Sequence, residues 1–422
     1  MTNLSHKYLE TALFLFFALF IFSSTFSIAL AQMSLGISLV LFLILVVAAR
    51  YNPFVPSLKW FYLFVALYIF WMLLSALVGF TPLRSILIIK EEWLFCVIPI
   101  GVFLFDRQEY RNKLVSAFAM GVLLVSIYGI IQHFTGIHWF KATPPKTATD
   151  FGYLACGGFS NPLTFGNYFG TAALFLIGYA FMQKKKLSKL TWLFFVSTSL
   201  FSTIATVLSY SRGVIIGLAV ALVILGLIAG RRYLLFSLVA IVVIVAAIVI
   251  FMPGLTARFS GKTEKDLGGV YEGGRVFVWK NSIKVIQKNP VFGVGQGNFQ
   301  AAYSTYLRPD IPEKRKLTHA HNDLLNVAAI SGIPGAVFFL GMWVAAISYF
   351  WKIRQTKTMM ERNGSYALAA LLASIVFFVT SLFEATFADE EVRQLLMFIW
   401  AAGLWPLYKN TKRENTLVAK NA

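Results

Sequence analysis

Long runs of apolar residues alternate with short polar segments along almost the whole chain. Twelve of these runs approach the length of about 20 residues that a helix needs to cross a hydrocarbon layer of about 30 Å. They cover 9–28, 31–49, 58–80, 88–105, 114–134, 162–182, 190–208, 213–229, 233–252, 334–351, 366–383 and 395–408. The fourth run is interrupted by Lys90, Glu91 and Glu92, and the twelfth is short. The pattern predicts an all-α polytopic membrane protein with about 12 transmembrane helices.

The composition supports a membrane protein. Of the 422 residues, 58% are apolar, 16% are aromatic and 13% are charged, whereas soluble domains contain about 45–50% apolar and about 25% charged residues. This balance excludes a soluble enzyme. Cys96 lies in an apolar run and Cys156 in a polar segment, so the two cysteines provide neither a disulfide framework nor the spacing of a metal site.

The formal net charge of +19 reflects membrane topology. Twenty of the 37 Lys and Arg residues lie in the terminal segments or the even-numbered connections between runs, and five lie in the short odd-numbered connections. Because positive residues accumulate on the cytoplasmic side, we expect both termini in the cytoplasm. No basic patch falls in a soluble module, so we expect no nucleic-acid partner.

The topology divides the chain into three parts. Transmembrane helices 1–9 occupy 1–252, a long extracytoplasmic loop occupies 253–333, and helices 10–12 with a cytoplasmic tail occupy 334–422. The segment 29–31 resembles a signal-peptidase site. An uncleaved anchor is favoured, because Lys7 is the only basic residue before the first run and Glu10 partly offsets it.

The long loop contains two regular features. Residues 276–288 have apolar and lysine stripes at helical spacing, which predicts an amphipathic helix on the membrane surface. It is either a simple interfacial helix or a helix whose first turn, with Arg275, binds an anion. The glycine-rich segment 290–298 lacks the context of a phosphate loop and predicts a tight turn.

The sequence THAHND at 318–323 places His319 and His321 just before the tenth run. The pair could be solvated, could bind zinc, or could supply a general base, since an ordinary histidine is mostly neutral near pH 7. We favour the base and expect no metal, because no Glu or Cys ligand occurs at a recognisable spacing. Asn322 and Asp323 are the nearest residues that could orient the ring.

Charged residues gather at the same outer level. The motif YSRG at 210–213, which begins with Tyr210, holds Arg212 at the outer boundary between two runs. Arg212 either anchors the helix in headgroups or grips phosphate oxygens through its planar fork. Further charges at this level could pair with one another or orient a sugar: Arg84, Lys90, Glu384, Asp389, Glu390 and Glu391.

Four motifs in this order resemble the bacterial O-antigen ligase family: YSRG at 210–213, GRVFVW at 274–279, PVFGVGQGNF at 290–299, and HN at 321–322 followed by GIPG at 332–335. Ala336 stands where the family pattern usually has Thr. The resemblance implies a GT-C-like, metal-independent, inverting glycosyltransferase. It implies that the catalytic histidine corresponds to His321 and the two essential arginines to Arg212 and Arg275, with His319 at a less invariant position.

The residues and the resemblance together predict an enzyme of the bacterial inner membrane that acts on the periplasmic face without a cofactor. It would transfer a glycan from undecaprenyl pyrophosphate to a lipid A–core sugar hydroxyl, among membrane lipids. Lys90, Arg84, His319, Asn322, Tyr210 and Asp389 would contact substrate. The alternatives are an O-antigen or exopolysaccharide polymerase, a protein-glycosylating ligase, and a transporter of lipid-linked glycans, for which ionisable residues should follow a path through the midplane.

Overall fold

The computed structural model describes residues 3–48, 51–139, 143–148, 151–259, 275–306 and 317–421. These residues are mostly helical and contain no β-strand, so the all-α polytopic prediction is confirmed. Ten of their helices are long and apolar enough to cross a membrane. They are α1 (Asn3–Ser23), α2 (Ile28–Ala48), α3 (Lys59–Val78), α6 (Gln108–Thr135), α7 (Pro162–Gln183), α8 (Lys189–Leu208), α9 (Arg212–Ala229), α10 (Arg231–Phe251), α14 (Asp323–Gln355) and α15 (Lys357–Ser381).

The fourth predicted span is not a continuous helix. The chain there forms α4 (Pro82–Ile89), a 3₁₀ segment η2 (Lys90–Cys96) and α5 (Val97–Asp106). The break coincides with Glu91 and Glu92, whose carboxylates each lie 3.2 Å from the buried guanidinium of Arg393. These ion pairs give both carboxylates a cationic partner, which a charged group in or near a membrane requires.

The twelfth predicted span lies within α16 (Glu390–Asn421). Three charged residues in the first turn of this helix lower its apolar character. Its described side chains are nevertheless among the most deeply buried in the protein, including Trp400 and Trp405. α16 packs against α5, α7 and α15 and is therefore a central helix of the core.

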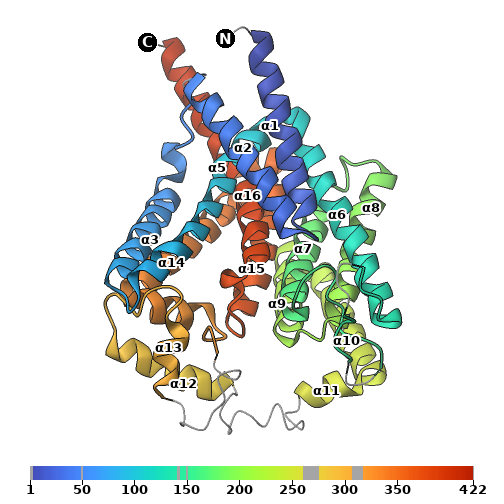
Figure 1. Ribbon diagram of the computed structural model, residues 1–422. Helices are drawn as coiled ribbons and strands as arrows, with labels where there is room; N and C mark the ends of the chain where they lie inside the picture. Colours follow the sequence, from blue (N-terminus) through green and yellow to red (C-terminus); the bar gives the residue numbers. More distant parts are fainter. Residues whose placement is uncertain are drawn as a thin grey trace.

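The two chain ends lie at one end of the helical assembly (Figure 1). The short helices α11 (Pro253–Phe259), α12 (Arg275–Lys288) and α13 (Phe299–Ser304) lie at the opposite end. Large apolar side chains are exposed along much of α2 and α10, as expected of helices that contact lipid. The assembly thus has two distinct ends separated by an apolar belt.

The glycine-rich segment folds back onto a break in α14. Gly332 has φ +73° inside α14, and Pro334 lacks the N–H that would bond to the Ile330 carbonyl. The N–H groups of Val294 and Gly295 donate instead to the Ala329 and Ile330 carbonyls, at 3.0 and 2.9 Å. The predicted tight turn is therefore present, and it satisfies the backbone groups that the break exposes.

This break changes the extent of the tenth span. The predicted run began at residue 334, but α14 already begins at Asp323. The added half-helix, 323–331, joins the histidine motif to the break at Gly332. The hydrogen bonds from the glycine-rich turn to the Ala329 and Ile330 carbonyls hold this half-helix, and with it the motif, in place.

Candidate functional site

His321 immediately precedes the N-cap of α14. Its backbone has φ +48°, a left-handed conformation that is uncommon outside glycine. Asn322 is the N-cap, and its side-chain oxygen accepts the Leu325 N–H at 3.0 Å. The indole N–H of Trp279 in α12 donates to the His321 carbonyl oxygen at 3.3 Å. These two hydrogen bonds hold the backbone on both sides of His321 in place.

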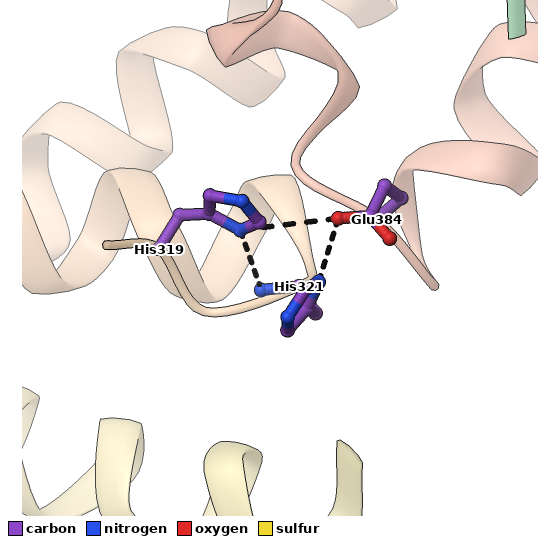
Figure 2. A group of neighbouring side chains, drawn as sticks. All are labelled: His319, His321 and Glu384. Carbon is purple, nitrogen blue, oxygen red and sulfur yellow. Dashed lines mark hydrogen bonds and ion pairs between the residues drawn. The ribbon is translucent and has the colours of Figure 1, made fainter. Parts of the chain in front are cut away.

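The partner of the His321 ring is Glu384, which lies between α15 and the 3₁₀ turn η5 (Thr386–Ala388). The His321 Nδ1 atom lies 2.6 Å from Glu384 Oε1, a hydrogen-bond distance. His319 Nδ1 lies 3.9 Å from the same oxygen, and it accepts the His321 backbone N–H at 3.4 Å (Figure 2). With its proton on Nδ1 toward the carboxylate, the neutral ring presents a lone pair on Nε2.

The sequence prediction for the residue that orients the ring was wrong. Asn322 caps α14 and donates to the Leu382 carbonyl oxygen, at 3.0 Å. Asp323 is buried and accepts hydrogen bonds from Thr386 Oγ1 and the Phe387 N–H. Both residues hold the 382–387 segment against α14, and this segment brings Glu384 to the histidine. The sequence predicted Glu384 at the same outer level as His321, but it could not show that the two side chains pair.

Arg275 is the first residue of α12, the predicted amphipathic helix. Its Nη2 atom lies 3.6 Å from Glu384 Oε2. The helix itself is confirmed, and the side chains that it buries against the protein are Val278, Asn281, Ser282 and Val285. Val276 and Ile283 of the predicted apolar stripe are exposed, which agrees with a stripe that faces a membrane surface. The predicted Gly273-Gly274 start lies outside the described residues.

Arg212 is the first residue of α9. Tyr210, two residues earlier, is buried and has φ +58°. α9 packs against α15, and a Cβ placed on Gly213 would lie 3.4 Å from the Cβ of Phe383. Arg212 thus begins its helix beside the segment that carries Glu384. The YSRG and HN motifs, about 110 residues apart, approach the same loop from two helices.

The remaining predicted residues surround this centre less closely. Asp389 accepts a hydrogen bond from Thr164 Oγ1 at 2.8 Å and lines the same cavity as His319. Arg84 is exposed and lies beside Gly297 of the glycine-rich turn. Lys90 is exposed at the start of η2.

Electrostatics keep Glu384 ionised and His319 neutral. Burial raises the pKa of Glu384, but His321, His319 and Arg275 together hold this pKa below its ordinary value. Burial and the neighbouring His321 lower the pKa of His319, against the opposing effect of Glu384. Burial, opposed by the Thr164 hydrogen bond, raises the pKa of Asp389 to about 7. The centre therefore combines an anionic carboxylate, a guanidinium and a histidine ring.

His319, His321 and Glu384 are also a possible metal-ligand set, because their ligand atoms all lie within 4.8 Å of one another. Sequence spacing had missed the carboxylate of this set. Ligands at about 2.0–2.2 Å from a tetrahedral zinc ion would place their donor atoms about 3.3 Å apart. The separation of 2.6 Å between His321 Nδ1 and Glu384 Oε1 fits a hydrogen-bonded pair better than two ligands of one ion.

Comparison with known proteins agrees with the motifs. Residues 197–340 match the family model described as O-antigen ligase. The matched region contains Arg212, Arg275 and His321, whereas Glu384 lies beyond it. No curated protein matches the chain.

Proposed function

We propose that the chain is a membrane glycosyltransferase of the ligase type. The premise is the match of residues 197–340 to the O-antigen ligase family. The protein transfers a glycan from undecaprenyl pyrophosphate to a sugar hydroxyl on lipid A–core. The observation that carries this proposal is the 2.6 Å contact between His321 Nδ1 and Glu384, with Arg275 3.6 Å from the same carboxylate. A histidine oriented by a carboxylate is suited to accept a proton.

In this mechanism the acceptor hydroxyl oxygen attacks the anomeric carbon from the face opposite the pyrophosphate. The bond between the anomeric carbon and the phosphate oxygen breaks, and its electron pair stays on the pyrophosphate. His321 Nε2 takes the hydroxyl proton during the attack, because a sugar hydroxyl is too weakly acidic to ionise first. Such a base contributes about 10²–10⁴-fold. Glu384 stabilises the imidazolium that forms.

Arg275 and Arg212 stabilise the charge that develops on the departing pyrophosphate. Each is the first residue of a helix, where free backbone N–H groups and the helix dipole also favour an anion. The two helix starts flank the Glu384 segment. A pyrophosphate leaves without being protonated, so the mechanism requires no general acid and no metal ion.

We further propose that the end of the protein with α11–α13 faces the periplasm and that both termini are cytoplasmic. The excess of basic residues near the termini supports this orientation in the bacterial inner membrane. Lys184, after α7, and Lys288, at the end of α12, are both exposed. Cysteine at position 184 should resist a membrane-impermeant thiol reagent in intact cells, and cysteine at position 288 should react. Equal reactivity at both positions would contradict this orientation.

Reconstitution tests the proposed reaction directly. Purified protein in liposomes is given undecaprenyl-pyrophosphate-linked glycan and lipid A–core, and the products are analysed by mass. We expect glycan on lipid A–core and free undecaprenyl pyrophosphate, with turnover unchanged by a chelator. Chain extension of the donor without use of lipid A–core would identify a polymerase. Movement of intact donor across the bilayer without bond cleavage would identify a transporter.

A further inference from the structure

A cavity of about 270 Å³ opens beside His319. It lies between the glycine-rich turn and α13 on one side, and η2, η5 and the first half of α14 on the other. Its volume is near the lower end of the range of about 300–1,000 Å³ usual for small-molecule sites. The cavity is therefore large enough for a small ligand such as one sugar residue.

The side chains that line the cavity do not suit a phosphate ligand. Four carboxyl groups line it, from Glu91, Glu92, Asp323 and Asp389. The guanidinium that lines it, from Arg393, is already paired with Glu91 and Glu92 at 3.2 Å. A pyrophosphate would meet carboxyl oxygens and no unpaired cation among these lining residues, whereas Arg275 lies beside Glu384, and neither Arg275 nor Arg212 lines the cavity.

A metal ion is an equally poor occupant. Among the described residues, the one group of three ionisable ligands close enough to share an ion is His319, His321 and Glu384. The cavity carboxyl groups of Asp323 and Asp389 accept hydrogen bonds from Thr386 and Thr164. The cavity therefore offers hydrogen-bond acceptors that form no such ligand group among the described residues.

Three polar atoms of lining residues have no hydrogen-bond partner within the described parts of the chain: Glu92 Oε2, Gln296 Oε1 and Arg393 Nε. Glu92 and Arg393 are 5% and 3% exposed, so these atoms lie just behind the cavity surface, where an unsatisfied polar atom is costly and a small side-chain shift toward a ligand would pair it. Two of these atoms accept and one donates. A hydroxyl group can both donate and accept, so a ring bearing several hydroxyls satisfies both kinds.

Aromatic side chains complete the lining. Tyr68, Phe299 and Phe387 supply flat apolar surface beside the polar atoms. A sugar ring has the same division, with apolar C–H faces and a polar edge. Pockets that combine apolar walls with a few placed polar groups bind and orient small molecules.

We infer that this cavity, bounded by Glu92, Gln296 and Arg393, binds the hydroxyl-rich acceptor sugar next to the His321 centre. The inference rests on the proposed transferase function. His319 belongs to both regions, because it lines the cavity and its ring centroid lies 4.5 Å from that of His321. An acceptor hydroxyl leaving the cavity past His319 reaches His321, while the donor pyrophosphate lies beside Arg275, which does not line the cavity.

The test fills the cavity without touching the catalytic centre. Ala388 lines the cavity and is exposed, so Ala388→Trp occupies its space. Ala301 in α13 is also exposed but does not line the cavity, and Ala301→Trp is the matched control. Gln296→Met is a milder second variant that removes one unsatisfied acceptor at nearly constant size. Thermal unfolding and size-exclusion profiles check that each variant is folded.

Two readouts are used. Core oligosaccharide freed from lipid A is titrated into protein without donor, and initial rates are measured with both substrates. We expect Ala388→Trp to weaken oligosaccharide binding and to raise the acceptor KM at least about tenfold, and Gln296→Met about three- to tenfold, in line with the loss of one hydrogen bond to a buried group. The donor KM should stay unchanged, and Ala301→Trp should match the wild type.

The outcomes separate the two proposals. Transfer by the wild type with normal acceptor KM in both folded cavity variants would overturn the cavity assignment and leave the transferase intact. A rise in donor KM instead of acceptor KM would also overturn it. Oligosaccharide binding that the cavity variants weaken, without any transfer by the wild type, would retain the sugar site and refute the transferase.

Discussion

The starts of α9 and α14 are built alike but position their functional residues differently. In each, a non-glycine residue in the left-handed conformation is followed by an extended N-cap and then the helix: Tyr210, Ser211 and Arg212 in α9, and His321, Asn322 and Asp323 in α14. Tyr210 and His321 are the two such residues in the described chain. Left-handed backbone at a non-glycine residue costs about 1–3 kcal/mol and often occurs at functional sites.

The difference lies in what surrounds each turn. Asn322 caps its helix with its side chain, and His321 is held by Glu384 and Trp279. Ser211 makes no side-chain cap. In α9 the strained residue, Tyr210, is a buried apolar anchor, and the charged residue is the first of the helix. A proton acceptor must hold its ring in one orientation. A cation that stabilises a departing group needs a fixed backbone position, from which its side chain can move with that group.

The largest expected effect is at the proton acceptor. His321→Ala should abolish transfer, a loss of at least about 10²–10⁴-fold, because His319, the other histidine at this centre, lies 3.9 Å from Glu384 Oε1 and is not oriented by a hydrogen bond to it. Donor binding should remain, since the ring acts only as the attack begins. His319→Ala should lose less. Turnover and donor binding by the purified variants test this, and the opposite order of effects would identify His319 as the base.

The next effect concerns the arginines. Arg212→Lys and Arg275→Lys keep the charge but lose the fork, and each should lower turnover roughly 10²-fold, about 2.7 kcal/mol. The double variant should fall less than additively if both residues act on one leaving group. Rates are compared at matched expression and thermal stability. Turnover near that of the wild type in both single variants would show that the two arginines act only as membrane anchors.

A smaller loss is expected at the residue that orients the base. Glu384→Gln keeps a hydrogen bond to His321 but removes its charge, which should cost about 2 kcal/mol, or about 30-fold in rate. Because the folded pKa of Glu384 is lowered, its stabilising contribution is complete above its ordinary pKa of about 4.3 and is lost as the pH falls through the lowered value.

Thermal unfolding of the wild type and Glu384→Gln across pH therefore provides an independent check. The stability difference should shrink as the pH falls below about 5, because the Glu384 carboxylate is then protonated in the folded protein. A difference that grows as the pH falls below about 5 would contradict the lowered pKa assigned to Glu384.

Hydropathy alone predicted most of the membrane helices and placed His321, Arg212 and Glu384 at the same ends of their helices, because each property depends on local sequence. It could not predict that Glu384 pairs with His321, since 63 residues separate them and only the packing of α14 against α15 joins them. It also missed the half-helix before Gly332, and it noted the interruption at Glu91 and Glu92 without predicting the 3₁₀ segment there. In both places, contacts with distant segments stabilise a backbone conformation or a charged side chain, and the local sequence pattern does not reveal these contacts.

The smallest expected effect compares the two N-caps directly. Asn322→Ala removes the cap of the Leu325 N–H and the hydrogen bond to Leu382, which together should lower the free energy of unfolding by about 2 kcal/mol. Ser211→Ala removes no cap and should change it by less than about 0.5 kcal/mol. Asn322→Ala should also slow transfer, because the cap fixes the residue that follows His321, whereas Ser211→Ala should leave the rate unchanged. Thermal unfolding and turnover of the two variants measure both effects in the same preparations. If Ser211→Ala slowed transfer as much as Asn322→Ala, the two helix starts would depend equally on their caps, and the distinction between a fixed ring and a fixed backbone would fail.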